Sequence, residues 1–346
     1  MNIDILTEEQ LKLLLSIIKD AKRVAVIGHK SPDGDAMGSS LSWARYLRTY
    51  HNLDVTIVVP DAYPDFLRWL PDCQNIIRYD KKKEEVVKLF SEVDTIFCMD
   101  MNQPSRVDEM ATVLMESPAK KVMMDHHLDP TTEVDLMTSN SEMCSTCEIV
   151  FRTVWQLGGF EEMDSKWATL VYCGMMTDTG GFTYNSSRPE IYFIVSNLLA
   201  KRIDKDKIYR NVYNNYSSWA IRLRGYIMAQ KLNVFEDFHA SYFAISRMDM
   251  DEYHYIKGDA EGLVNIPLTI KGLKLSISLR EDDRKDNLVW VSLRSVDNFP
   301  ANEVCERFFN GGGHKNAAGG YLNCSLDEAC GVARDAINAY AEQLKK

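Results

Sequence analysis

Aspartate and histidine side chains gather at four separate places in this sequence, each shortly after an apolar run. The runs cover residues 24–27, 95–99, 121–124 and 170–176, and the side chains that follow them are His29, Asp33 and Asp35, then Asp100, then Asp125, His126 and His127, and finally Asp178. Carboxylates and imidazoles can together hold two divalent cations, and such a pair can clamp a phosphate during hydrolysis. These residue types and their placement predict a two-metal hydrolase.

The position of each group after an apolar run indicates how the groups come together. A single acidic residue at such a place is usually a turn or a helix cap, and adjacent histidines are often polar loop residues. Four strand-like runs that all end in Asp or His instead indicate one site along the carboxyl edge of a parallel sheet. Within it, the lone carboxylate of Asp100 suits a bridge between two cations, and His126 and His127 are expected to have different roles.

The expected elements of the first part of the chain alternate between strand and helix. Strands are expected at 24–27, 55–59, 95–99 and 122–124, and helices at 8–19, 38–50, 145–156, 165–171 and 189–201. This alternation is typical of a doubly wound parallel sheet with helices on both faces.

The second part of the chain has a different pattern. Its strand-like segments lie at 231–235, 240–246, 274–279 and 288–292, and in them apolar and polar residues alternate, as in strands with one solvent-exposed face. Helices are expected at 301–309 and 325–343. We therefore predict an α/β protein with an N-terminal doubly wound parallel-sheet domain (1–203), a linker (204–216) and a smaller C-terminal α/β domain with a mixed sheet (217–346).

Composition and charge narrow the classes of partner. The 346 residues are 45% hydrophobic and 26% charged, which is ordinary for a globular protein. The formal net charge of −10 argues against long or duplex nucleic acid, which needs an extended basic surface. We expect no signal peptide and no membrane span, and the eight cysteines, mostly inside apolar segments, favour the cytoplasm. The single pair Cys144-x-x-Cys147 is interpreted as two incidental cysteines at a helix start.

The donor set also indicates the metal. Oxygen-rich ligation with two histidines favours Mn²⁺, with Mg²⁺ or Co²⁺ as substitutes, and the lack of thiolates in the set argues against structural zinc. Two cations bridged by a carboxylate and able to clamp a phosphate predict phosphoester hydrolysis.

The motifs that carry these residues resemble those of a known family. Residues 28–39 (GHKSPDGDAMGS), Asp100, Asp125, His126, His127 and the pair Asp178 and Thr179 resemble the four motifs of the DHH phosphoesterase superfamily, and residues 311–319 (GGGHKNAAG) resemble the signature of its DHHA1 subfamily. Among DHHA1 proteins the chain looks like the stand-alone bacterial group of nano-RNases and pAp phosphatases. The resemblance implies that such a protein hydrolyses very short oligoribonucleotides to mononucleotides and removes the 3′-phosphate of pAp.

The resemblance also implies roles for individual residues. His29 and Asp33 would hold one metal, Asp35, His126 and Asp178 the other, and Asp100 would bridge them. His127 would face the substrate phosphate. Asp125 is expected to orient His126 from behind, because a ligating imidazole usually has such a partner.

The second domain holds the expected substrate-binding residues. Gly311, Gly312 and Gly313 are expected to form a loop that points backbone N–H groups at an anion, with His314 beside it. Arg294, at a strand end, is expected to clamp a phosphate bidentately, through two parallel N–H donors of its guanidinium group. A flexible glycine turn and an ordinary surface arginine are the alternatives.

Other functions stay open at this point. A cyclic or linear dinucleotide phosphodiesterase, of the type that acts on c-di-AMP or pApA, is the nearest alternative, and a pyrophosphatase or exopolyphosphatase is disfavoured. A nucleotide sensor without catalysis is disfavoured by the intact set of six ligands. A homodimer is compatible with all of these interpretations.

Overall fold

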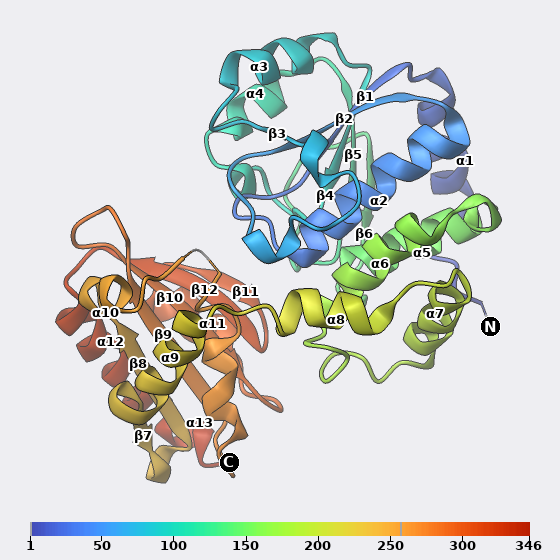
Figure 1. Ribbon diagram of the computed structural model, residues 1–346. Helices are drawn as coiled ribbons and strands as arrows, with labels where there is room; N and C mark the ends of the chain where they lie inside the picture. The colour runs from blue at the N-terminus through green and yellow to red at the C-terminus, as the bar shows by residue number, and fades with distance from the viewer. Residues whose placement is uncertain (1, 257) are drawn as a thin grey trace. The chain divides into compact units, whose positions relative to one another are not determined.

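The computed structural model describes residues 2–256 and 258–346 and divides into two compact units between Asn215 and Tyr216 (Figure 1). Each unit has its own sheet and its own hydrophobic core. Within the described residues, no helix combines the length and apolar character that crossing a bilayer requires.

The first unit is built on a six-stranded sheet in the order β3-β2-β1-β4-β5-β6, with every neighbouring pair parallel. Its strands are β1 (Arg23–Ile27), β2 (Asp54–Val59), β3 (Ile77–Arg78), β4 (Thr95–Met99), β5 (Lys120–Asp125) and β6 (Leu136–Ser139). The strand order reverses between β1 and β4, which is the switch point where such sheets bind ligands. The predicted doubly wound fold is confirmed.

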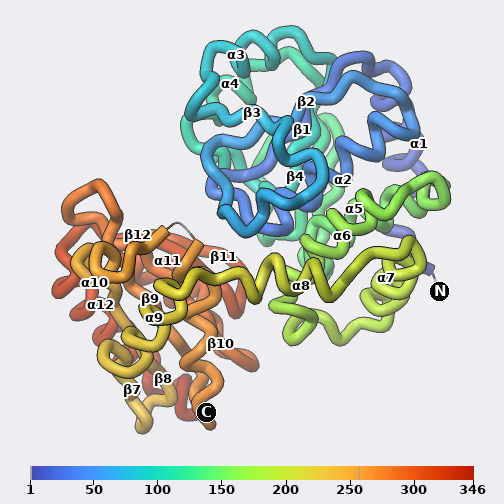
Figure 2. The backbone as a smooth tube through the Cα atoms, viewed as in Figure 1, coloured from blue at the N-terminus to red at the C-terminus, as the bar shows by residue number. Residues whose placement is uncertain are grey.

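Helices cover both faces of this sheet because its strands are apolar on both sides. Ala25 and Ile27 of β1 belong to a cluster with α3 (Lys83–Glu92) and α4 (Met110–Glu116), while Val24 and Val26 belong to the larger core on the other face. That larger core contains residues of α1 (Glu8–Asp20), α2 (Gly34–His51), α5 (Thr146–Gln156), α6 (Ser165–Asp178), α7 (Pro189–Ala200) and α8 (Lys205–Tyr213). Figure 2 shows α3 and α4 on the side of the strands opposite to α5 and α6.

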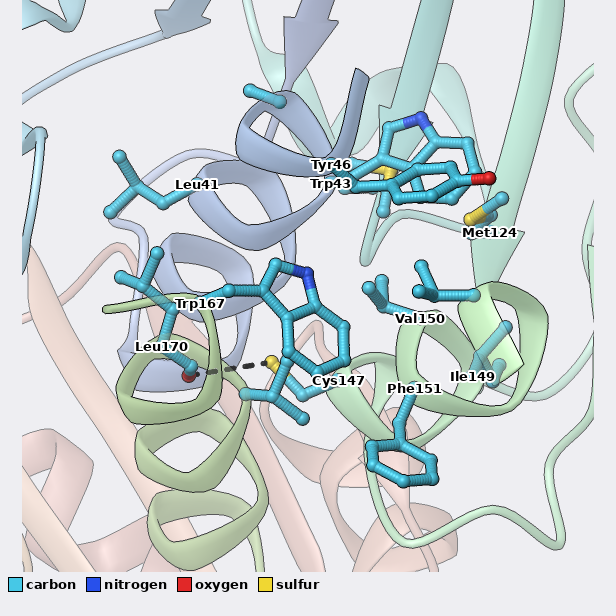
Figure 3. Packing of buried hydrophobic residues seen from close by; sticks show 14 of the residues in the cluster. Leu41, Trp43, Tyr46, Met124, Cys147, Ile149, Val150, Phe151, Trp167 and Leu170 are labelled. Carbon is cyan, nitrogen blue, oxygen red and sulfur yellow. Dashed lines mark hydrogen bonds between the residues drawn. The ribbon is translucent and has the colours of Figure 1, made fainter. Parts of the chain in front are cut away.

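Helices α2 and α6 pack so closely that their contact requires glycine. A Cβ on Gly38 would lie 2.7 Å from the carbonyl oxygen of Leu170, and one on Gly34 would lie 2.3 Å from Oγ1 of Thr177. Cys147 of α5 joins this contact, since its Sγ faces the same Leu170 carbonyl at 4.0 Å (Figure 3). The beginning of α2 therefore lies against the end of α6, which brings the residues that follow the first and fourth apolar runs together.

We expect Gly38→Ala to lower the free energy of unfolding by about 1–3 kcal/mol, because the added methyl group meets the backbone carbonyl oxygen of Leu170 at 2.7 Å and the buried Sγ of Cys147 at 2.9 Å. Gly331→Ala in α12 (Leu326–Ala339) is the matched control, since a Cβ there meets nothing within 4 Å. It should be neutral or stabilising by up to about 1 kcal/mol. Urea unfolding measures both, and a Gly38→Ala protein as stable as the wild type would contradict the close packing of α2 on α6.

The second unit has a mixed six-stranded sheet in the order β11-β12-β10-β9-β8-β7, in which only the β8–β9 pair is parallel. Its strands are β7 (Asn233–Phe235), β8 (Ala240–Ile245), β9 (Leu275–Glu281), β10 (Val289–Ser295), β11 (Gly312–His314) and β12 (Ala317–Leu322). One core lies between this sheet and α11 (Ala301–Phe308), α12 and α13 (Ala341–Leu344). A smaller cluster joins Phe243 and Ile245 of β8 to α9 (Ser218–Tyr226) and α10 (Arg247–Glu252). The predicted mixed sheet is confirmed.

Three local predictions differ from the structure. The run 170–176, interpreted as a strand, lies inside helix α6, and all its residues are buried, which removes the polar face that marks a surface helix. The segment 204–216, interpreted as a linker, consists mostly of α8, because Ile208 and Val212 are buried in the core of the first unit. Helix α2 begins at Gly34 instead of 38, since Asp33 caps it.

Candidate metal centre

The topology of the first unit places three of the four groups at neighbouring strand ends. β1, β4 and β5 are adjacent in the sheet, and their carboxyl ends lead to His29, Asp100 and His126 respectively. Asp178 does not follow a strand; it is the last residue of helix α6. The predicted convergence of the four groups is therefore present in the structure, although one group reaches the site from a helix.

Asp100 lies at the centre of this cluster and is almost completely buried. Its Oδ2 lies 3.4 Å from His29 Nε2, and its Oδ1 lies 3.6 Å from His126 Nε2. Its backbone has a φ of 58°, a left-handed conformation that aspartate tolerates better than most residues. The two oxygens thus face two different histidines, as a bridging carboxylate requires.

The first group of donors consists of His29, Asp33 and Asp100, whose donor atoms all lie within 4.8 Å of one another. Asp33 also caps α2, because its Oδ1 accepts hydrogen bonds from the backbone N–H groups of Asp35 and Ala36, both at 3.0 Å. Its other oxygen, Oδ2, lies 3.8 Å from His29 Nε2. The cap and the ligand role therefore use different oxygens of the same carboxylate.

The second group consists of Asp35, Asp100 and His126, again with donor atoms within 4.8 Å. His126 Nε2 lies 3.9 Å from Asp35 Oδ2 and 3.2 Å from Oδ2 of Asp178, so Asp178 adds a fourth donor. The two groups share Asp100 and no other residue. This division agrees with the roles that the family resemblance implies.

Backbone carbonyls select the ring nitrogens that face the cluster. His29 Nδ1 lies 2.7 Å from the carbonyl oxygen of Lys30, and His126 Nδ1 lies 3.2 Å from that of Met143. A carbonyl only accepts, so Nδ1 must carry the proton and a neutral ring keeps its lone pair on Nε2. In both histidines Nε2 is the nitrogen that faces Asp100, which is the arrangement of a metal ligand with a hydrogen bond behind it.

The acidic and imidazole groups of the cluster shift one another's pKa values. Burial, together with the carboxylates of Asp100 and Asp178, raises the pKa of Asp35 well above its ordinary value. Burial alone would lower the pKa values of His29 and His126, but the surrounding carboxylates, Asp100 foremost, outweigh it and raise both. Burial opposes ionisation of Asp100 as well, yet its contact with His29 and the charges of the three histidines hold its pKa well below the usual range.

The residues present fit two divalent cations. His29 Nε2 is buried and has no hydrogen-bond partner within the described part of the chain. Carboxylate and imidazole donors face one another at 3.2–3.9 Å, a spacing at which they can share a cation. Because ligands must be deprotonated to bind a metal, metal binding at such a site would release protons.

Asp125 has a different partner from the one expected. It is fully buried, and its Oδ1 lies 2.8 Å from His127 Nδ1, while its Oδ2 accepts the His127 backbone N–H at 2.8 Å. The prediction that Asp125 orients His126 is therefore wrong, because the carbonyl of Met143 fills that position. Asp125 holds His127 in place, and His127 Nδ1 also lies 3.6 Å from Asp100 Oδ1.

In the second unit, the expected glycine loop is a strand. Gly312 and His314 belong to β11, which pairs with β12, and Gly313 has a φ of 141°. A Cβ on Gly311 would lie 2.0 Å from the Gly319 carbonyl oxygen, so the glycines allow two backbones to approach closely. The prediction of a loop at 311–313 is wrong for Gly312 and Gly313, because they pair with β12 as part of β11.

Arg294 lies near the end of β10, as its position in the sequence suggested. Its Nη1 donates to the carbonyl oxygen of Leu293 at 2.9 Å, and its Nε is buried with no hydrogen-bond partner within the described part of the chain. A role in phosphate binding for Arg294 and His314 stays a prediction.

The sequence interpretation missed the residues at the start of α5. The backbone N–H groups of Thr146 and Cys147 donate to the two oxygens of Asp35, at 2.6 and 2.9 Å, and Thr146 Oγ1 donates to Asp100 Oδ1 at 2.9 Å. Serine is a preferred helix N-cap residue, so the start of the helix at Ser145 could be predicted from the sequence. The contacts of Thr146 with Asp100 and Asp35 could not be predicted, because these residues lie 46 and 111 positions away in the sequence.

Comparison with known proteins agrees with this architecture. A family model described as the DHH family, N-terminal domain, matches residues 23–175, and one described as the DHHA1 domain matches residues 240–343. The crystal structure of an exopolyphosphatase-related protein from Bacteroides fragilis is 43% identical in sequence, with a TM-score of 0.93, and the match covers 99% of this chain and 100% of that chain.

Two curated relatives are more distant. The bifunctional oligoribonuclease and PAP phosphatase NrnA of Thermus thermophilus is 25% identical over 323 residues, which is 93% of this chain and 91% of the relative. The cyclic-di-AMP phosphodiesterase PdeA of Listeria monocytogenes is 23% identical over 334 residues, which is 94% of this chain but 49% of the relative. With both domains matched and a close structural relative along its full length, the chain belongs to the DHH family of phosphoesterases and carries a DHHA1 domain.

Proposed function

We propose that this protein is a Mn²⁺-dependent phosphoesterase that hydrolyses short oligoribonucleotides to mononucleotides and removes the 3′-phosphate of pAp. The observation that carries the proposal is the pair of donor groups that share the buried carboxylate of Asp100. The likeness to the Thermus thermophilus oligoribonuclease and PAP phosphatase over 93% of the chain supports the substrate class.

The ligand roles follow from the two donor groups. His29, Asp33 and Asp100 would hold one cation, and Asp35, Asp100, His126 and Asp178 would hold the other. When bound, two divalent cations would neutralise phosphate charge and activate a water molecule for attack on phosphorus. The donor chemistry suits Mn²⁺, Mg²⁺ or Co²⁺.

The remaining residues would act on the substrate. Asp125 fixes the ring of His127 through Nδ1, so we assign Nε2 to the substrate phosphate, where it would position the phosphoryl group. Arg294, Gly311, Gly312, Gly313 and His314 are proposed to bind the nucleotide, with the guanidinium of Arg294 as the phosphate clamp.

A cyclic or linear dinucleotide phosphodiesterase is the second candidate. The observation that favours it is the match of 94% of this chain to the cyclic-di-AMP phosphodiesterase of Listeria monocytogenes. Both candidates use the same metals and the same phosphodiester chemistry, so the choice of substrate separates them.

We expect pAp and two- to five-nucleotide RNAs to be hydrolysed about ten times faster or more, in kcat/KM, than twenty-nucleotide RNA, which is about 1.4 kcal/mol of transition-state stabilisation. The physical reason is charge, because a net charge of −10 opposes the binding of a long polyanion. The measurement is release of mononucleotides and phosphate with Mn²⁺ from a panel that also contains cyclic di-AMP, pApA and polyphosphate.

The same panel has controls and a contradicting outcome. EDTA should abolish turnover of every substrate, and added Mn²⁺ should restore it. Faster turnover of cyclic di-AMP than of pAp and trimers would favour the second candidate. Degradation of twenty-nucleotide RNA as fast as trimers would refute the proposed preference for short substrates.

A further inference from the structure

Thr146 donates hydrogen bonds to both Asp35 and Asp100. It is the first residue of α5 and is fully buried. Its backbone N–H donates to Asp35 Oδ2 at 2.6 Å, and its hydroxyl donates to Asp100 Oδ1 at 2.9 Å. It therefore contacts one carboxylate of the second donor group and the carboxylate that the two groups share.

A buried ion-pair network holds the start of α5 in place. Ser145 caps the helix by accepting the Glu148 N–H at 3.1 Å, and the Glu148 carboxylate accepts the Cys144 N–H at 2.7 Å. Glu148 is fully buried and also accepts hydrogen bonds from Arg152 at 2.7 Å and Arg188 at 2.6 Å. Thr146 thus lies on backbone that is anchored on both sides, so its hydroxyl has a fixed position.

A fixed hydroxyl has a specific effect on a bridging carboxylate. Asp100 must turn Oδ2 toward His29 and Oδ1 toward His126, and rotation about its terminal torsion would spoil both directions. The hydrogen bond from Thr146 uses one lone pair of Oδ1 and leaves the other for a cation. Hydrogen bonds of this kind behind a metal ligand orient it and strengthen metal binding.

We propose that Thr146 is a positioning residue of the metal centre: its hydroxyl sets the orientation of the Asp100 carboxylate, while its backbone N–H sets that of Asp35. The inference rests on the proposed metal-binding roles of these two aspartates. The backbone contribution survives any substitution, so the hydroxyl is the part that can be tested.

The test is a Mn²⁺ titration of the full chain without substrate. The concentration of free Mn²⁺ is measured at each step by electron paramagnetic resonance. Thr146→Val keeps the shape of the side chain and removes the donor, so we expect metal affinity to fall by about tenfold or more at the weaker site. Thr146→Ser keeps the donor and should bind Mn²⁺ within about threefold of the wild type. With pAp at saturating Mn²⁺, kcat should fall in Thr146→Val while KM changes little.

Thr153→Val is the matched control. Thr153 is on the same helix and fully buried, and its hydroxyl has no hydrogen-bond partner within the described part of the chain. The same substitution there should leave Mn²⁺ affinity unchanged. Circular dichroism confirms that each variant is folded, and Thr146→Ala replaces Thr146→Val if the latter does not fold, with the same expected loss.

The outcomes separate the inference from the proposed function. A wild-type protein that binds no Mn²⁺ would overturn both. A wild-type protein that binds two Mn²⁺ ions, with a folded Thr146→Val variant of equal affinity, would overturn only the role of Thr146. Equal losses in Thr146→Val and Thr146→Ser, or in Thr153→Val, would also overturn it, because the hydroxyl would then not be the cause.

Discussion

Asp100→Ala should reduce phosphoesterase activity by about 1,000-fold or more and deplete both metals, the largest loss that we expect from a single substitution. The reason is the position of the carboxylate between the two donor groups, with Oδ2 toward His29 and Oδ1 toward His126. The other five proposed ligands are each assigned to one cation, so the loss of any one of them should weaken one metal more than the other.

The measurement for Asp100 is metal content by elemental analysis together with turnover of pAp. Asp65→Ala is the control, because Asp65 is an exposed carboxylate of the first unit that pairs with Arg68 at 2.8 Å on the surface. It should change neither quantity, since exposed ion pairs contribute little. An inactive Asp100→Ala protein that still holds two tightly bound metals would show that Asp100 is not the bridge.

His126→Gln and His127→Gln should separate metal binding from catalysis, although the two residues are adjacent. His126 Nε2 faces three carboxylates at 3.2–3.9 Å, so its replacement should deplete one metal. His127 Nδ1 is bound to Asp125, which is not one of the six proposed ligands. We therefore expect His127→Gln to keep its metals while kcat falls by about 100-fold or more, as for the loss of a group that acts on the substrate.

Elemental analysis and steady-state kinetics of the two variants test this division. Asp125→Asn provides a further comparison, because it keeps the shape of the side chain but loses the charge next to His127. It should resemble His127→Gln and lower kcat without emptying the metal centre. Equal metal loss in His126→Gln and His127→Gln would contradict the assigned roles.

The architecture of the first unit could be predicted from the sequence because its parallel strands are buried on both faces. Such strands appear as continuous apolar runs, and 24–27 and 95–99 match β1 and β4 closely. The same reasoning failed at 170–176, where a helix is buried on all sides. A fully buried helix and a buried strand have the same apolar character over seven residues, so periodicity does not separate them.

Which side chain hydrogen-bonds to which metal-centre histidine depends on the direction in which each side chain points, and no local sequence pattern encodes that direction. Successive residues after a strand point in different directions, so the sequence did not reveal whether Asp125 contacts His126 or His127. The structure pairs it with His127 and gives His126 the carbonyl of Met143. Likewise, the glycines at 311–313 have the composition of a loop, but Gly312 and Gly313 belong to β11, which pairs closely with β12.

The sequence by itself determined the donor chemistry of the centre, because ligand types and the strand ends that carry them are local properties of the chain. Tertiary structure alone decided which residues orient those donors. Thr146 shows the reason most directly. It contacts Asp100 and Asp35 across 46 and 111 residues of chain, and contacts of that separation are set by the packing of α5 against α2 and the sheet.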